Sequence, residues 1–422
     1  MKICCKHVFI KHKYFTNNVI FISHIMKKLL LVIGLILLFA TEILQVYFIM
    51  PFPGSQQANT IDLAYFLQEY KWPIRIFSLA IVFAGIYNRF SFWKTWQKMF
   101  FIAGLTLYAV IFYFVNFRFL ADKIFYQPKH KNFATTTNNK VPVDKLIIGI
   151  TGNGEAKAYP IEIIGYHHQV RDSLGNQPVM VTYCTVCRTG RVFIPAVDGK
   201  PETFRLVGMD HFNAMFEDST TKSWWRQVNG EAIAGPLKGK QLQEFPSQQM
   251  RLSSWIEKYP GTGIFQPDKD FQKKYDSLAG FDNGTVKSSL EKRDSGSWKF
   301  KSWVVGVSYN HNSVAYDWND LLKQKTLNDS LPGLPLLIAI EPDSVTFHVF
   351  NRTVNNNSLI FQRDSTTKLL TDHLTHSSWD YTGNCIDGPL KGNSLQRVQA
   401  YQEFWHSWQT FHSGTRVYKN GK

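Results

Sequence analysis

Three apolar segments open the chain, and a long part follows in which short apolar runs alternate with polar turns. Leu29–Met50, a segment near 72–90 and a segment near 99–119 approach or exceed the roughly 20 residues that a helix needs to cross a membrane. We therefore predict three transmembrane α-helices within a membrane region that covers residues 29–121. The lipid bilayer is the partner that this pattern implies.

Basic residues beside the apolar segments predict the orientation of the chain. They lie before the first segment and between the second and third: Lys27, Lys28, Arg89, Lys94 and Lys98. The positive-inside rule then makes residues 1–28 cytoplasmic and puts everything after residue 121 outside. Met26, followed by two lysines, is typical of a bacterial start, which makes residues before Met26 a spurious extension. We expect a multi-pass protein of the bacterial cytoplasmic (inner) membrane with a large exterior C-terminal domain.

Strand-like apolar runs between Gly, Pro and Asn dominate the exterior part. The runs that predict strands are Ile147–Ile150, Val179–Tyr183, Arg191–Pro195 and Phe204–Val207. The best helical patterns are short, at Ser253–Tyr259 and Gln402–Thr410. We predict a mainly β (α+β) exterior domain.

Two parts of the exterior region resemble each other in sequence. Val181–Phe193 has the same apolar rhythm as Ile338–Phe350, and the five residues Gly235–Gly239 recur unchanged as Gly388–Gly392. These matches keep their order along the chain. The predicted organisation is a linker at 122–145, a first repeat at 146–266, a linker at 267–299 and a second repeat at 300–422.

Composition narrows the function without naming it. The net charge is +15, but no long run of Lys or Arg is present, so we do not expect nucleic acid as a partner. Five cysteines occur, of which Cys4 and Cys5 fall in the doubtful extension. Cys184, Cys187 and Cys385 remain, too few for a disulfide framework.

The pair Cys184 and Cys187 is the strongest candidate site. It lies between two strand-like runs, which predicts a strand–turn–strand knuckle rather than the helix start of a thioredoxin-type site. Three chemistries stay open: a transition-metal site (zinc, iron or copper) with His167 as a further ligand, a redox-active dithiol, and a structural disulfide. The second repeat has no Cys-x-x-Cys, so a four-cysteine zinc site is excluded.

A polar and aromatic cluster beside a Gly-rich turn is a second candidate. It predicts either a braced turn or the lining of a ligand cleft in which an indole stacks on the ligand. Its members are Asp218, Ser223, Trp225, Gln227 and Glu231.

These motifs resemble a bacterial and archaeal family catalogued as Domain of Unknown Function 3179. The resemblance runs over residues 140–420 and is carried by Ala158-Tyr-Pro, Pro178–Cys187, Gly235-Pro-Leu-x-Gly239, and Trp255 with Pro260. The family usually has Gly where this chain has Arg188, and often an acid where it has His168. It implies no established activity.

We therefore expect an uncharacterised membrane-anchored envelope protein whose exterior domain carries a metal or thiol-redox site. The alternative is a non-catalytic ligand-binding or scaffolding module with a structural disulfide. A third hypothesis is an enzyme that acts on a small molecule through the region Asp218–Glu231.

Overall fold

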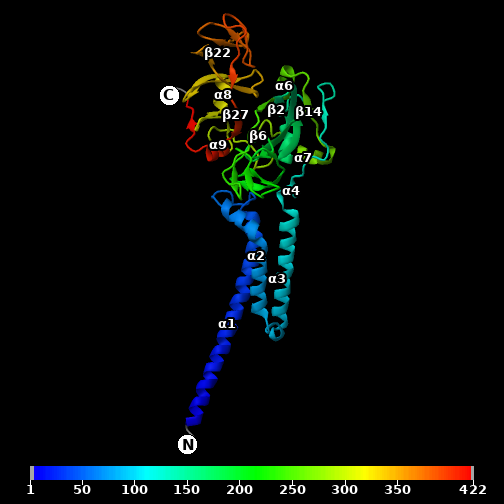
Figure 1. The fold of residues 1–422 in the computed structure, drawn as a ribbon, viewed down its shortest axis with the longest axis vertical. Coiled ribbons are helices and arrows are strands. Elements are labelled where there is room, and N and C mark those ends of the chain that lie inside the picture. The colour runs from blue at the N-terminus through cyan, green and yellow to red at the C-terminus, as the bar shows by residue number, and fades with distance from the viewer. Residues whose placement is uncertain (1–3, 420–422) are drawn as a thin grey trace. The chain divides into compact units, whose positions relative to one another are not determined.

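The structure is a computed structural model that describes residues 4–419, with side chains from residue 23 onward. The chain forms two compact units, a helical unit at Met1–Ile124 and a sheet-containing unit at Phe125–Lys422. We describe each unit by itself (Figure 1).

The helical unit is built on two antiparallel helices in close contact. Gly34 and Gly85 allow this approach, because a Cβ on Gly34 would lie 2.7 Å from Val82 and a Cβ on Gly85 would lie 2.7 Å from the backbone of Leu31. The elements are α1 (Cys4–Tyr47), α2 (Ile61–Ile86), η1 (Phe90–Phe92), α3 (Thr95–Tyr113), η2 (Phe114–Arg118) and α4 (Ala121–Ile124).

Within the part of the chain that the structure describes, two helical segments, Ser23–Tyr47 and Thr95–Arg118, are long and apolar enough to cross a membrane. The expectation of three such segments is corrected at 72–90, which falls largely within α2. Every stretch of 18 residues in α2 contains Glu69, Lys71 and Arg75, so this helix is too charged to qualify by length and composition.

A buried polar cluster joins the three long helices. Glu42 of α1 accepts hydrogen bonds from Arg75 of α2 at 2.7 and 2.8 Å, and Asn116 in η2, directly after α3, donates to Glu42 at 2.8 Å. Tyr108 of α3 donates to the same carboxylate at 3.1 Å. Glu42 is 0% exposed and Arg75 is 2% exposed, so the charges neutralise each other inside the unit.

The first half of the sheet-containing unit, which we define as residues 125–266, holds several small sheets. One five-stranded sheet has the order β1-β14-β3-β2-β13, and smaller sheets have the orders β4-β5-β6, β12-β11-β10-β9 and β7-β8. The elements are β1 (Phe133–Ala134), β2 (Leu146–Gly152), β3 (Glu155–Pro160), α5 (Ile161–His167), β4 (Gln169–Leu174), β5 (Gln177–Cys184), β6 (Thr189–Phe193), β7 (Ala196–Val197), β8 (Lys200–Pro201), β9 (Phe204–Asp210), β10 (Asn213–Asp218), β11 (Trp224–Arg226), β12 (Ala232–Ala234), β13 (Gln248–Arg251), α6 (Leu252–Lys258) and β14 (Gly263–Phe265).

The second half, residues 300–419, has a similar order of elements. Its sheets have the orders β27-β15-β16-β28, β17-β18-β19-β26, β20-β21 and β22-β23-β24-β25. The elements are β15 (Trp303–Tyr309), β16 (Asn312–Asp317), α8 (Trp318–Gln324), β17 (Thr326–Leu331), β18 (Leu334–Ile340), β19 (Phe347–Asn351), β20 (Thr353–Val354), β21 (Asn357–Ser358), β22 (Phe361–Arg363), β23 (Leu370–Asp372), β24 (Ser378–Trp379), β25 (Cys385–Asp387), β26 (Gln396–Arg397), β27 (Ala400–Phe404), α9 (Trp405–Phe411) and β28 (Arg416–Val417).

The fold is therefore a mixture of helices with many small sheets, and the expectation of a mainly β domain holds only in part. One predicted helix is also shorter than expected. In Gln402–Thr410, the first three residues belong to strand β27, and α9 begins at Trp405. Gln402 and Glu403 pair with β15, so sheet pairing overrides their helical pattern.

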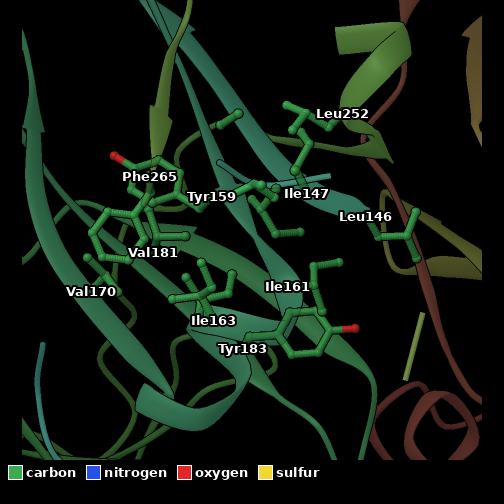
Figure 2. Close-up of a cluster of buried hydrophobic side chains, with 14 of the residues drawn as sticks. Leu146, Ile147, Tyr159, Ile161, Ile163, Val170, Val181, Tyr183, Leu252 and Phe265 are labelled. Atoms are coloured by element: carbon green, nitrogen blue, oxygen red, sulfur yellow. The ribbon is translucent and has the colours of Figure 1, made fainter. Parts of the chain in front are cut away.

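The core of the first half lies between the large sheet and its neighbours. Figure 2 shows Tyr159, Ile163 and Val181 converging from β3, α5 and β5. All three are at most 5% exposed. Within 267–299, the segment expected to be a linker, Phe271 and Phe281 join this same core, and the segment contains η3 (Lys269–Phe271) and α7 (Gln272–Asp276).

Candidate functional site

The two cysteines lie on a hairpin turn between β5 and β6. Cys184 is the last residue of β5 and faces Thr189, the first residue of β6, across the hairpin. The turn is closed by a hydrogen bond from the Arg188 amide to the Thr185 carbonyl at 3.3 Å. The pair thus lies on a strand–turn–strand knuckle and not in the first turn of a helix.

Both thiols are free and 0% exposed. Burial raises the pKa of Cys184, but hydrogen bonds from the Cys187 thiol and from the Cys187 and Ala214 amides, together with the Lys301 ammonium, outweigh burial and leave that pKa below its ordinary value. Burial and the hydrogen bond to Cys184 raise the pKa of Cys187 well above its ordinary value. The pair is therefore asymmetric, and Cys184 is the thiol that ionises first.

The second half of the unit holds the backbone of this turn. The Val186 carbonyl accepts from Lys301 Nζ at 2.8 Å and from His406 Nε2 at 3.1 Å, and the Cys187 carbonyl accepts from the Phe404 amide at 3.0 Å. We call these three contacts the carbonyl clamp. Figure 1 shows β27, which carries the Phe404 amide, beside β6.

The electrostatics of the carbonyl clamp follow from its burial. His406 is 2% exposed, and burial and the Lys301 charge lower its pKa to about 3, so the ring is neutral at pH 7. Its Nε2 carries the proton because the partner is a carbonyl, which can only accept. Phe300 stacks on the same ring at 4.2 Å. Lys301 is 8% exposed; burial lowers its pKa, and the two cysteines oppose that shift.

Arg188, directly after the pair, also joins the two halves. Its φ is +57°, a left-handed conformation that favours glycine. Its guanidinium donates to Gln402 Oε1 at 3.0 and 2.9 Å, donates to the Phe281 carbonyl at 3.2 Å and lies 3.8 Å from the centre of the Trp303 ring. The conformation explains why glycine suits this position, and the contacts explain what arginine adds.

His167 is engaged away from the cysteines. Its Nδ1 donates to the Tyr126 carbonyl at 2.5 Å and its Nε2 accepts from the Tyr275 hydroxyl at 2.7 Å, so both ring nitrogens are occupied. Burial lowers the pKa of His167. The structure therefore gives His167 a structural role and does not join it to the pair.

A metal at the pair would need more ligands than the described side chains bring there. Among those side chains, no group of three or more His, Cys, Asp or Glu could hold a metal ion. Cys385 is engaged separately, with its thiol directed at the Asp387 carbonyl at 3.4 Å. The residues present thus do not fit the zinc, iron or copper site that the sequence left open.

The predicted cleft residues brace a turn. Asp218 accepts from the Thr221 amide at 2.5 Å, from the Ser223 amide at 3.0 Å and from Trp225 Nε1 at 2.9 Å. The Ser223 hydroxyl in turn accepts from the Leu237 amide at 3.0 Å. Asp218, Ser223 and Trp225 are at most 1% exposed. Their polar atoms are used inside the protein, which favours the braced turn over the cleft.

The other two members of that cluster are also paired. Gln227 is 0% exposed and bonds to the side chains of Thr182, Thr189 and Asn213. Glu231 forms an ion pair with Arg226 at 2.9 Å and is the most exposed of the five.

Sequence reasoning missed the three residues of the carbonyl clamp. Phe404 acts through its backbone amide, which leaves no side-chain signal. Lys301 gave a weak signal, because a single lysine between Phe300 and Trp303 at the start of an apolar strand needs a buried partner. His406 is a single histidine on a short helix, and its position in the sequence gave no pattern that linked it to the cysteines.

Comparison with known proteins identifies the family. No curated protein and no solved structure matches the chain. Residues 126–415 match the family described as "Protein of unknown function (DUF3179)". Because that match covers more than half of the 422 residues, the chain belongs to the DUF3179 family.

Proposed function

We propose that this protein is a membrane-anchored envelope protein in which Cys184 and Cys187 form a buried dithiol–disulfide couple that controls how firmly the two halves of the sheet-containing unit are joined. The observation that carries the proposal is the carbonyl clamp. The turn that bears both thiols is the same turn that the second half holds through Lys301, Phe404 and His406.

The chemistry is ordinary thiol–disulfide exchange with a small disulfide. The Cys184 thiolate attacks one sulfur of the disulfide, which forms a mixed disulfide and releases one thiolate. The Cys187 thiolate then attacks the Cys184 sulfur, closes the intramolecular disulfide and releases the second thiolate. The protein loses two protons and two electrons, and the small disulfide becomes two thiols. Because both sulfurs are buried, the expected oxidant is small.

Oxidation and the carbonyl clamp are coupled because they share one turn. In the reduced state the Cys187 thiol donates to Cys184. The Cys184 thiol donates to the Phe212 carbonyl at 3.4 Å. Closing the disulfide removes both hydrogen bonds and changes the turn whose carbonyls meet the second half. The two processes are thermodynamically linked. If oxidation changes the free energy with which the two halves dock, then docking changes the free energy of oxidation by the same amount.

The test is a comparison of the full chain in detergent in its reduced and oxidised states. We expect two thiols at 184 and 187 that small reagents reach in the folded protein but bulky reagents reach only once urea is added, and a shift in the urea midpoint on oxidation. Cys385→Ser is the matched control and should leave that shift intact. An oxidised protein with the same urea midpoint as the reduced protein would sink the proposal.

Lys301→Met tests the electrostatic part. Removing the ammonium removes one of the charges that favour the Cys184 thiolate, so the alkylation of Cys184 by a small reagent should move to higher pH. The variant Lys299→Met, which removes an exposed charge nearby in sequence, should not move it. An unchanged pH profile in Lys301→Met would show that Lys301 does not act on the thiol.

A second candidate is a non-catalytic module in which the pair is a permanent structural disulfide. Complete burial of both sulfurs favours it, because buried cysteines exchange poorly. The two candidates differ in one measurement. A switch is reduced by millimolar dithiothreitol under native conditions and regains its free thiols, whereas a structural disulfide is not reduced until the protein unfolds.

For the membrane part, we propose that α2 returns alongside α1, so that the chain crosses the membrane three times and residues after 121 lie outside. Two contacts between these segments support this: Arg89 donates to the His24 carbonyl at 3.0 Å, and Arg75 pairs with Glu42 at 2.7 Å. Arg75 thereby enters the bilayer with its charge neutralised.

Reporter fusions after residues 55, 91 and 125 test the three crossings and should report outside, inside and outside. Equal reports at 55 and 91 would exclude a crossing by α2.

We also propose that 146–266 and 300–422 are two copies of one domain. The support is a set of contacts that recur. Asp372 accepts from the Thr375 amide, the Ser377 amide and Trp379 Nε1, as Asp218 does in the first half. Matched alanine substitutions of Gly149 and Gly306, one in each half, test it.

A further inference from the structure

A cavity of about 310 Å³ lies where the first half, the second half and the segment 267–299 meet. Lys145 and Arg188 line it from the first half, Asp282 and Arg293 from the intervening segment, and Trp303 from the second half. At roughly 30 Å³ for each water, the cavity has the volume of about ten water molecules. That is the lower end of the range for small-molecule sites.

Two guanidinium groups in this cavity have no carboxylate at ion-pair distance among the residues that the structure describes. Arg188 donates only to the Gln402 amide and to backbone carbonyls, and Arg293 donates to the Asn319 amide oxygen at 2.5 Å. Both lie over the Trp303 ring, at 3.8 and 4.2 Å from its centre. They repel each other, and the pKa of each is lowered, first by burial. The nearest carboxylates attract the two guanidinium groups only over distances longer than an ion pair.

Several hydrogen-bonding atoms on the cavity wall are buried and find no partner within residues 23–419. Trp303 is 5% exposed, and its Nε1 donor meets no acceptor. The Nε of Arg293 is likewise unpartnered, as is Oδ1 of Asp282. An unsatisfied buried polar group costs about 1–3 kcal/mol. A wall with two unpartnered donors and two cations that lack a carboxylate at ion-pair distance therefore favours an acceptor that carries negative charge.

We infer that this cavity is a binding site for a small oxyanion, a carboxylate or a phosphate group. The oxygens of such a group accept from Arg293 Nε and Trp303 Nε1, and its charge offsets the two guanidinium groups. Planar guanidinium groups match carboxylate and phosphate oxygens in geometry as well as charge. The site requires no change in the redox state of Cys184 and Cys187, so it stands apart from the proposed couple.

The pH dependence of binding follows from Asp282. Its Oδ2 accepts from the Leu146 amide at 2.9 Å, and burial and the charge of Glu162 raise its pKa to about 7, against opposing effects of Arg188 and Lys145. Below pH 7 the carboxyl group is neutral and can donate its proton to a bound oxyanion; above pH 7 its charge repels the ligand. Affinity should therefore fall as pH rises through 7. The charged groups that line the cavity are Asp144, Lys145, Glu162, Arg188, Arg251, Asp282 and Arg293.

Calorimetric titration of the full chain in detergent, with sodium phosphate in one arm and sodium acetate in the other, tests the site at constant ionic strength set by sodium chloride. The preferred arm identifies the class of oxyanion. We expect saturable binding in at least one arm, an affinity loss of tenfold or more in Arg293→Gln, and a loss of severalfold in Trp303→Phe, which keeps an aromatic ring but removes the Nε1 donor. Arg416→Gln, outside the cavity and paired with Asp329, is the control and should bind as the unaltered chain does.

Every outcome decides the inference. Absence of saturable binding up to 20 mM in both arms overturns it. Equal affinity of the unaltered chain and Arg293→Gln also overturns it, because the ion then binds elsewhere. If Arg293→Gln unfolds, Trp303→Phe carries the test alone, and thermal unfolding in detergent tells a folded variant from an unfolded one.

Discussion

At the scale of single residues, Arg188 combines an unfavourable backbone with favourable side-chain contacts. A non-glycine residue at φ +57° carries a strain of roughly 1–2 kcal/mol. The contacts of the guanidinium stabilise the fold by more than this strain, because the group bonds to Gln402 and Phe281, which are distant in sequence, and lies over Trp303. The residue thus exchanges local strain for contacts between the two halves.

Arg188→Gly should lower the free energy of unfolding by about 2 kcal/mol, because the lost hydrogen bonds of a buried charged group outweigh the relieved strain. Urea unfolding of the full chain in detergent measures this. Lys368→Gly is the matched control, since Lys368 has φ +62° but lies on the surface. An Arg188→Gly variant as stable as the unaltered chain would contradict the role given to this side chain.

His406 makes stability depend on pH. Its folded-state pKa of about 3 lies below the value of about 6.5 expected in the unfolded chain, so the unfolded state binds a proton that the folded state excludes. Stability is therefore full above pH 6.5 and falls as the pH drops from 6.5 towards 3. The slope from this group is about 1.4 kcal/mol per pH unit.

His406→Gln should flatten that slope by the same amount, as measured by urea unfolding at pH 7, 6 and 5. His373→Gln replaces an exposed histidine and should leave the slope unchanged. If the slopes of His406→Gln and the unaltered chain agree, His406 is not held neutral in the folded state.

At the scale of elements, each half packs a tryptophan against a glycine of an inner strand of its sheet. A Cβ on Gly149 would lie 2.3 Å from the ring of Trp255, and a Cβ on Gly306 would lie 2.3 Å from the ring of Trp408. The indole of Trp255 donates to Thr262 at 2.8 Å, and that of Trp408 donates to Thr415 at 2.9 Å. In both halves, a helix thus lies on a strand only because the strand has glycine at the contact.

Gly149→Ala and Gly306→Ala should each destabilise the unit, by about 1–3 kcal/mol, because the indole has to move. Thermal unfolding in detergent measures the change. Gly261→Ala, where a Cβ meets nothing within 4 Å, should be neutral. A clear loss at one position with none at the other would count against two copies of one domain.

The sequence predicted some elements well and others poorly, for physical reasons. The apolar runs around Cys184 and Cys187 predicted the hairpin because strand pairing here is local. At Asp218 the sequence could not choose between a ligand cleft and a braced turn, because a carboxylate that braces a turn and one that lines a site have the same residue type and neighbours. Only the three-dimensional structure tells whether the donors to the Asp218 carboxylate come from the turn itself. The carbonyl clamp joins residues more than 100 positions apart and left no local pattern.

At the scale of the molecule, the helical unit depends on a charged centre in apolar surroundings. Glu42 and Arg75 are stable there only as a pair, supported by Asn116 and Tyr108. An isolated charge in such surroundings is far more costly than the pair. Arg75 is one of the charged residues that make α2 too polar in composition for a membrane span. The same residue fixes α2 to α1 through its ion pair with Glu42.

Arg75→Leu should destabilise the helical unit by about 3–5 kcal/mol, since it leaves Glu42 buried without a partner. The double variant Glu42→Leu with Arg75→Leu should recover most of the loss. Thermal unfolding of the full chain in detergent measures both, with Lys28→Leu, which removes an exposed charge of α1, as control. A double variant as unstable as Arg75→Leu would contradict the pairing.

The carbonyl clamp also bears on how freely this turn can evolve. Lys301, Phe404 and His406 bind the main-chain oxygens of Val186 and Cys187, and every amino acid presents such an oxygen. The second half therefore contacts the backbone of the turn through these donors, and these contacts do not depend on the side chain at position 186. Substitutions there that keep size and apolar character leave the contact intact, so the inner residues of the Cys-x-x-Cys can drift in sequence while the junction of the two halves persists.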